Sequence, residues 1–339
     1  QLIKVKGSAT VALGRDRQTP SLIDGKVRIA PTGDAVEFFA VFDRPALLLA
    51  HAASLLSGFE KSWPRGTQRF VKTLPMPNVL PVERRAEISV EEFLRDYARP
   101  GKPVVLTGLT RDWPAQQRWT FEFFREHYGH LSVEVRRETL RDKQFVAMNM
   151  GDYIDYLLTT QEDSPLYLAS WDFMEVAPEL RADFQLPEIF ADDWLLQVPA
   201  EIRPRLLWLF IGPARTGFRL HQDVGHTAAG NIQISGRKRW AFFPADQKHN
   251  LYYGRVDAFA PDLERFPNFK RASMYECVQE AGEAVFTPST WWHQTCILEP
   301  SIAVSGNYAN ASNLDSVLAW LAQNPIPGLA EALEKISLA

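Results

Sequence analysis

The sequence is poor in cysteine, in long apolar runs and in excess charge of one sign. Cys277 and Cys296 are its only cysteines, which excludes a disulfide framework and favours a reducing compartment, the cytoplasm. No apolar run reaches the roughly 18 residues of a membrane span, and no signal peptide opens the chain, so we expect no membrane association. A formal net charge of -4 without a long basic run makes nucleic acid an unexpected partner.

What the sequence does have is ample apolar surface. Of its 339 residues, 46% are hydrophobic and 12% are aromatic, so we expect a folded globular protein. We predict that residues 1–76 form a small α+β region of unknown role. Its strands are expected at 4–13, 26–30 and 35–42 and its helix at 43–59. The prolines of "KTLPMPNVLPVE" then interrupt regular structure and indicate a domain boundary.

The rest of the chain changes from mixed structure to β structure. Ser89 and Glu92 predict a capping box before a short helix, and 103–109 predicts a buried strand. Short β-rich runs separated by Gly, Pro and Asn follow from Leu206, as in a compact antiparallel barrel or sandwich. Further short elements are helices at 120–129, 149–160, 313–323 and 328–339, and strands at 206–212, 230–236, 238–244, 283–288 and 302–309.

Within the β-rich region, "GFRLHQDVGH" places His221 and Asp223 two residues apart. On an extended segment such residues point to the same side, so an imidazole and a carboxylate can enter one cavity. His293 in "TPSTWWHQT" offers a third ligand from another strand. Two histidines and one carboxylate with open positions form the facial triad of non-haem Fe(II) oxygenases. Alone, an H-x-D is more often a turn aspartate beside a surface histidine.

Lys238, one strand after these residues, has two interpretations. It can be solvated surface charge, as we expect for Arg237 and Arg239. Alternatively its ammonium lies in the cavity, and because an unpaired buried charge is strongly disfavoured, it then implies a ligand that carries a carboxylate.

Several short motifs in a fixed order make a family resemblance specific. They are "DSPLYL", "LPEIFADDW", "WLFIGPARTG", "HQD", "GNIQISGRKRWAFFP", "ERFPNF" and "PSTWWH", spread between about Pro103 and Asn313. In them the sequence resembles the jumonji-C (cupin-like) 2-oxoglutarate and Fe(II)-dependent oxygenases. The similarity is greatest to the lysyl-hydroxylase/arginine-demethylase branch, of phosphatidylserine-receptor type. It is more distant to the asparaginyl hydroxylase that acts on hypoxia-inducible factor.

The resemblance implies a fold and a role for individual residues. The fold is mainly β with flanking helices around a double-stranded β-helix (jelly-roll) core, over residues 77–313. His221, Asp223 and His293 would hold Fe(II), and Lys238 would pair with the distal carboxylate of 2-oxoglutarate. Other residues at cosubstrate positions are Tyr167, Asn231, Asn307 and, at an aromatic position that is equally explained as core, Trp208.

One position departs from the family. A threonine that donates to the distal carboxylate is common three residues before the first metal histidine, whereas this chain has Phe218. Ser305 or Tyr167 can replace that donor, or a shifted register can bring Thr216 to it. His226 is interpreted as a loop histidine, and the tryptophan pair "WW" before His293 as packing beneath it.

The expected activity is hydroxylation of a side chain of a protein or peptide. It consumes O2 and couples to decarboxylation of 2-oxoglutarate to succinate and CO2. Demethylation is hydroxylation of an N-methyl group, so the motifs do not separate the two. The alternatives are a hydroxylase of a small molecule, such as an amino acid or a biosynthetic intermediate, and a non-catalytic cupin-fold binding protein. The latter finds support in Phe218 alone.

A C-terminal helical segment, 314–339, carries an apolar stripe that must be covered. Leu314, Val317, Leu318 and Leu321 recur at helical spacing. Either these helices form a homodimer, as C-terminal helices do in related oxygenases, or they dock on the chain's own barrel.

Overall fold

The computed structural model describes residues 2–5, 36–39, 77–138 and 143–338. The chain divides into two compact units, residues 1–75 and 76–339. In the first unit, strands β1 (Leu2–Val5) and β2 (Val36–Phe39) form an antiparallel pair. The strand predicted at 26–30 and the helix predicted at 43–59 lie outside the described residues.

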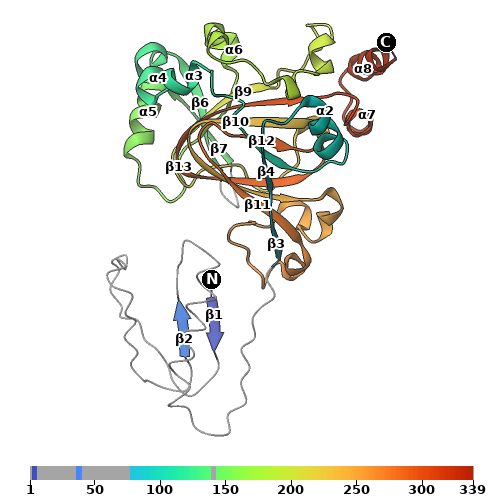
Figure 1. Ribbon diagram of the computed structural model, residues 1–339. Coiled ribbons are helices and arrows are strands. Elements are labelled where there is room, and N and C mark those ends of the chain that lie inside the picture. The colour runs from blue at the N-terminus through green and yellow to red at the C-terminus, as the bar shows by residue number, and fades with distance from the viewer. Residues whose placement is uncertain (1, 6–35, 40–76, 139–142, 339) are drawn as a thin grey trace. The chain divides into compact units, whose positions relative to one another are not determined.

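The second unit is built around one nine-stranded sheet (Figure 1). Its main path follows the order β4-β5-β12-β10-β13-β9-β8, and β11 pairs with both β10 and β3. All pairs are antiparallel except β11 with β3 and β4 with β5. The strands are β3 (Asn78–Pro81), β4 (Glu83–Ala86), β5 (Val104–Thr107), β8 (Leu168–Trp171), β9 (Leu207–Gly212), β10 (Ala228–Phe243), β11 (Ser273–Gln279), β12 (Ala284–Thr287) and β13 (Trp292–Tyr308).

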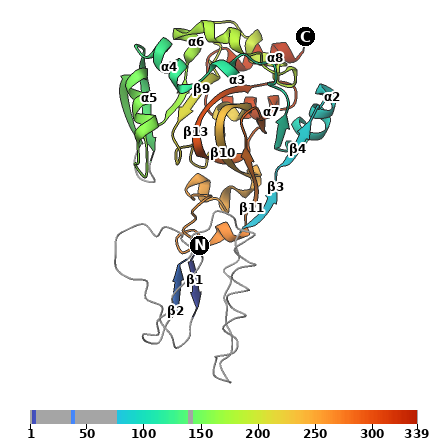
Figure 2. The same ribbon diagram turned by 60° about the vertical axis from the view of Figure 1, so that its left-hand side comes forward.

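Two long strands, β10 and β13, pair along most of their length and curve together around the barrel (Figure 2). The first half of β10 also pairs with β12 and its second half with β11, so one strand contributes to two parts of the barrel wall. Register shifts between Gln233 and Lys238 bend the strand, and Gly236 adopts a left-handed φ of 74° there. The two strands predicted at 230–236 and 238–244 are therefore one, because a bulge bends a strand without ending it.

Short helices flank the barrel. Ser89 caps α2 with the predicted capping box, in which Ser89 Oγ accepts from Glu92 N at 3.2 Å and Glu92 Oε2 accepts from Ser89 N at 3.0 Å. Helices α4 and α5 lie beside a separate two-stranded ribbon, β6 with β7, which the sequence analysis missed (Figure 1). These elements are α2 (Val90–Phe93), α3 (Ala115–Arg118), α4 (Phe121–Tyr128), α5 (Met150–Thr159), α6 (Phe173–Val176), β6 (Ser132–Glu138) and β7 (Lys143–Asn149).

The two predicted C-terminal helices are present, as α7 (Leu314–Leu321) and α8 (Leu329–Ser337). Val317 and Leu321 are buried with Leu333 in an apolar cluster that Leu195 and Val198 complete from a preceding segment of the same chain. The apolar stripe of α7 is thus covered within the chain. Among the described helices, none has the length and apolar character that crossing a bilayer demands.

Candidate metal and cosubstrate site

Three candidate metal ligands meet where the chain segment before β10 pairs with the start of β13. His221 and His293 exchange backbone hydrogen bonds, His221 N to His293 O at 3.0 Å and His293 N to His221 O at 2.8 Å. This pairing places the two imidazole rings 4.2 Å apart between centroids. Asp223 Oδ1 lies 3.7 Å from His221 Nε2 and 3.6 Å from His293 Nε2, so the three side chains converge on one point.

Backbone carbonyls orient both imidazoles. His221 Nδ1 lies 2.7 Å from Arg219 O, and His293 Nδ1 lies 3.2 Å from Trp291 O. A carbonyl oxygen only accepts, so each Nδ1 carries the hydrogen and each Nε2 keeps its lone pair. Both lone pairs are then available on the side of Asp223, as in metal-binding histidines whose other nitrogen is held by a backbone carbonyl.

The neutral state of both imidazoles suits a cation. Removal from bulk water, reinforced by the neighbouring His293, lowers the pKa of His221 to about 4, and burial lowers the pKa of His293 to about 4. Burial also raises the pKa of Asp223 above its ordinary value, and Asp223 Oδ2 is buried without a hydrogen-bond partner. Two neutral imidazoles and a carboxylate oxygen that lacks a partner form a donor set that fits a divalent metal ion.

The triad lies on the wall of a cavity of about 480 Å³. Nine of the residues for which the sequence or the family resemblance predicts a role in the site line this cavity. They are Tyr167, Trp208, His221, Asp223, Asn231, Lys238, His293, Ser305 and Asn307. Because β9, β10 and β13 are neighbours in the sheet, residues that are distant in sequence reach the cavity together.

Lys238 lies inside this cavity rather than on the surface. The residue is only 3% exposed, and its Nζ donates a long hydrogen bond to Asn231 Oδ1 at 3.4 Å. Burial lowers the pKa of the ammonium to about 7. Among the described residues it makes no ion pair with a carboxylate, whereas its neighbours Arg237 and Arg239 pair with Glu280 and Glu276 outside the cavity. A buried amine without an anionic partner fits a ligand that brings a carboxylate.

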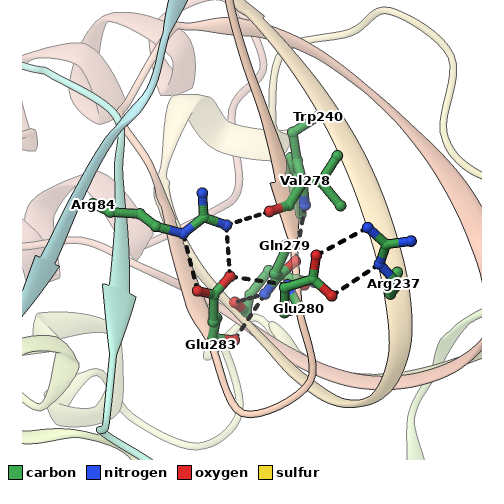
Figure 3. A network of polar contacts seen from close by, with 8 residues as sticks. Arg84, Arg237, Trp240, Val278, Gln279, Glu280 and Glu283 are labelled. Carbon is green, nitrogen blue, oxygen red and sulfur yellow. Dashed lines mark hydrogen bonds and ion pairs between the residues drawn. The ribbon is translucent and has the colours of Figure 1, made fainter. Parts of the chain in front are cut away.

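Gln279 on β11 fixes the strand that carries Asn231 and Lys238 (Figure 3). It is fully buried, its Nε2 donates to Asn231 O and Glu283 O at 2.9 Å each, and its Oε1 accepts from Trp240 Nε1 at 2.8 Å. A network of this kind holds β10 rigid beside the cavity. It is closed at the surface by the ion pairs Arg84–Glu283 and Arg237–Glu280.

The structure reduces the number of residues that can replace the missing threonine as a donor to the distal carboxylate. Phe218 lines the cavity, and its ring stacks on the His221 ring with centroids 5.3 Å apart. Thr216 does not line this cavity, and its hydroxyl donates to Pro213 O at 2.7 Å. Tyr167 remains available, and so does Ser305, whose Oγ makes only a long hydrogen bond to Gly230 O at 3.5 Å. Thr295, which the sequence analysis missed, is a further candidate because its Oγ1 accepts from Phe218 N at 2.9 Å and keeps its hydrogen for a ligand.

Thr295 could have been found from the spacing of the sequence. It follows His293 by two residues on β13, so both side chains point to the same side of the strand. The "WW" pair was interpreted as packing beneath His293, but other rings occupy that place. Trp291 packs on Tyr275 instead, and the rings beside His293 are those of Trp240 and Phe242, at 6.1 and 6.0 Å.

His226 stays outside the triad. It ends the short 3-10 turn Val224–His226 with a left-handed φ of 49°, and its carbonyl accepts from Ser289 Oγ at 2.6 Å. The group of residues whose ligand atoms lie within 4.8 Å of one another contains His221, Asp223 and His293 and no other described residue. The sequence interpretation of His226 as a loop histidine agrees with this position.

A jelly-roll barrel that brings two imidazoles, one carboxylate and a buried lysine into one cavity defines a metal-binding cupin. The sequence profile of the cupin-like domain matches residues 90–313, and this chain belongs to that family. The predicted family resemblance is therefore confirmed.

The chain is similar to several known proteins, of which three are described here. The chain is 36% identical over 249 residues to the lysine-specific demethylase JMJ21 of Arabidopsis thaliana, a match that covers 70% of this chain and 26% of that protein. It is 33% identical over 263 residues to the bifunctional arginine demethylase and lysyl-hydroxylase psr-1 of Caenorhabditis briggsae, covering 72% and 65%. It is 28% identical over 263 residues to the 2-oxoglutarate and iron-dependent oxygenase JMJD4 of Mus musculus, covering 69% and 62%. The chain thus spans less than two thirds of each of these relatives.

Proposed function

We propose that this protein is a 2-oxoglutarate- and Fe(II)-dependent dioxygenase that hydroxylates a side chain of a protein or peptide. The observation that carries the proposal is the position of Lys238 in the same cavity as the triad His221, Asp223 and His293. A metal site alone fits many chemistries. A metal site with a buried amine that awaits a carboxylate fits the keto-diacid cosubstrate in particular.

The residues of the chain have distinct tasks in this activity. His221, Asp223 and His293 would hold the iron through neutral Nε2 atoms and a carboxylate oxygen. Bound iron supplies the oxidising chemistry, in which O2 and 2-oxoglutarate are converted, with hydroxylation of a C–H bond, to succinate and CO2. Lys238 would bind the distal carboxylate and so fix the orientation of the cosubstrate. Trp208, Phe210 and Trp240 give the cavity an aromatic wall.

The substrate class rests on the relatives. Their names include a bifunctional arginine demethylase and lysyl-hydroxylase, which acts on amino-acid side chains. Hydroxylation and N-demethylation share the same oxidation step, so the site supports both outcomes. We extend the relatives' chemistry to a protein or peptide side chain here and take a small-molecule substrate as the alternative outcome of the test.

The test is turnover by the purified chain. We expect succinate formation that requires added Fe(II), 2-oxoglutarate and O2 together. Incubation with cell extract, followed by mass spectrometry, should show the addition of one oxygen atom to a peptide. The same gain on metabolites alone would replace the protein substrate with a small molecule. Absence of 2-oxoglutarate binding and of succinate formation would leave a metal-binding cupin without this activity.

The proposal also covers the compartment of the protein and its oligomeric state. We propose a reducing compartment, the cytoplasm, because Cys277 and Cys296 are both free thiols. We also propose that the C-terminal helices dock within the chain instead of forming a homodimer, because Val317 and Leu321 are already buried against Leu195 and Val198.

A further inference from the structure

A second cavity, which we call the basic pocket, adjoins the catalytic cavity. Its volume is about 140 Å³, and three arginines line it, Arg136, Arg215 and Arg219, with Ser164 and Thr216 beside them. Asp257 is the one acidic residue in its lining. Arg215 and Arg219 alone place two guanidinium groups against one carboxylate, which makes the pocket electropositive, and nothing in the proposed activity uses it.

Two of the three arginines, Arg215 and Arg219, keep their side chains unpaired in the described part of the chain. Among the described residues, the side chains of Arg215 and Arg219 make neither an ion pair nor a hydrogen bond. Asp257 is already engaged, because its Oδ1 accepts from Phe259 N at 2.9 Å, from Ala260 N at 3.2 Å and from Gln294 Nε2 at 2.8 Å. Arg215 and Arg219 therefore retain donors for a ligand.

The segment that carries two of these arginines is held rigidly. Arg215 N donates to Ile297 O at 2.8 Å, Ile297 N to Thr216 O at 2.7 Å, and Thr295 N to Phe218 O at 3.0 Å. Gly217 allows this close approach, because a Cβ there would lie 2.1 Å from Thr295 O. Arg215 itself is held at a left-handed φ of 73°, a strained conformation for a non-glycine residue that is often found at binding sites.

Three side chains, two of them aromatic, lie between the two cavities. Phe218, Tyr167 and Thr295 line both of them. The Arg136 guanidinium lies 3.9 Å from the centroid of the Phe218 ring, which also stacks on His221. The basic pocket is therefore a separate compartment with its own charge, one side chain away from a metal ligand.

We propose that the basic pocket is an oxyanion-binding site, distinct from the cosubstrate position at Lys238, that takes a carboxylate or phosphate group of a small molecule. Guanidinium groups bind both groups through paired N–H donors, and hydroxyls such as that of Ser164 add a neutral donor. The volume fits one such group with a short stem.

The test measures binding of inorganic phosphate and of malonate to the full chain by calorimetry, at constant ionic strength adjusted with chloride. We expect saturable binding that Arg219→Gln and Arg215→Gln each weaken by about 10-fold or more, since each removes a charged donor. Arg271→Gln is the matched control, because it removes the same charge from an exposed arginine outside the pocket. The stronger of the two probes identifies phosphate or carboxylate as the preferred group.

Three results overturn the site. They are no saturable binding, equal loss in Arg271→Gln, which indicates general surface charge, and loss in Lys238→Met, which places the anion in the cosubstrate cavity. Arg219→Gln keeps the test valid if Arg215→Gln does not fold, because Arg219 is not in the left-handed region. Thermal unfolding of each variant provides the folding check. Since the readout is binding, the result does not depend on whether the chain turns over 2-oxoglutarate.

Discussion

At the scale of single residues, Lys238 distinguishes the proposed dioxygenase from other metal-binding cupins. Lys238→Met keeps most of the stem but removes the charge, so a cosubstrate carboxylate would be buried without a partner. We expect affinity for 2-oxoglutarate to fall about 30-fold to several thousand-fold, with metal affinity unchanged. Lys238→Arg should be intermediate, because its longer planar group cannot occupy the same point. Anaerobic titration with Mn(II) in place of Fe(II) measures both affinities. Unchanged affinity in Lys238→Met would remove the cosubstrate assignment.

The same lysine predicts a pH dependence. Its pKa in the unliganded protein is lowered to about 7, while an unfolded lysine titrates at the ordinary value of 10.5. Above pH 7 the unliganded side chain is neutral and must take up a proton to pair with a carboxylate. Binding of 2-oxoglutarate is therefore expected to weaken as pH rises above about 7 and to consume a proton near pH 8. Calorimetry at pH 8 in buffers of different ionisation enthalpy measures that proton; equal heats in all buffers would contradict the prediction.

Proton linkage also predicts how Lys238 changes the free energy of unfolding as the pH rises. The unfolded chain binds the lysine proton between pH 7 and 10.5 and the folded, unliganded chain does not. The contribution of Lys238 to the free energy of unfolding therefore rises with pH across this window and is unfavourable below it. Lys238→Met should flatten that part of the stability curve.

His293 gives the sharpest test of the metal site. His293→Ala removes one of three converging ligands and is expected to abolish iron-dependent succinate formation and to weaken metal binding. His226→Ala is the matched control, since His226 lies outside the triad, and it should retain both. Turnover is measured beside the thermal unfolding midpoint. Activity near that of the unchanged protein in His293→Ala would exclude it as a ligand.

At the scale of elements, the bend of β10 decides whether Asn231 and Lys238 face one cavity. Gly236 forms that bend at a φ of 74°, and a Cβ there would lie 2.2 Å from Pro300 O. Gly236→Ala is expected to lower the free energy of unfolding by about 1–3 kcal/mol or more and to weaken 2-oxoglutarate binding. Gly306→Ala is the control for stability, because its nearest neighbour would be Leu207 Cδ1 at 3.5 Å. Denaturant unfolding compares the two; equal losses would show that the bend needs no glycine.

At the scale of the whole molecule, the C-terminal helices act as a cover. Ending the chain before Asn313 would expose Leu195 and Val198, which Leu321 and Leu333 now bury. We expect the shortened chain to unfold at lower temperature and to self-associate, while the full chain is monomeric in light scattering. A stable dimer of the full chain that becomes a monomer on truncation would instead support dimerisation through these helices.

Local patterns in the sequence determined a good part of this protein. The capping box at Ser89 depends on residues three apart, and the C-terminal helices depend on an apolar stripe, so each formed where predicted. The pairing of His221 with Asp223 follows from the period of two on extended chain. These features depend on neighbours in sequence, and their geometry is fixed by the backbone itself.

Tertiary structure alone decided which of three adjacent cations enters the cavity. Arg237, Lys238 and Arg239 alternate along β10, but only the pairing with β11 and β13 shows that Lys238 points inward and the two arginines pair with glutamates outside. Strand pairing also makes residues 228–243 one continuous strand and places Thr295 beside Phe218. The basic pocket assembles arginines from β6 and from the segment before β10. Contacts between distant segments leave no period in the sequence, so the fold had to bring them together.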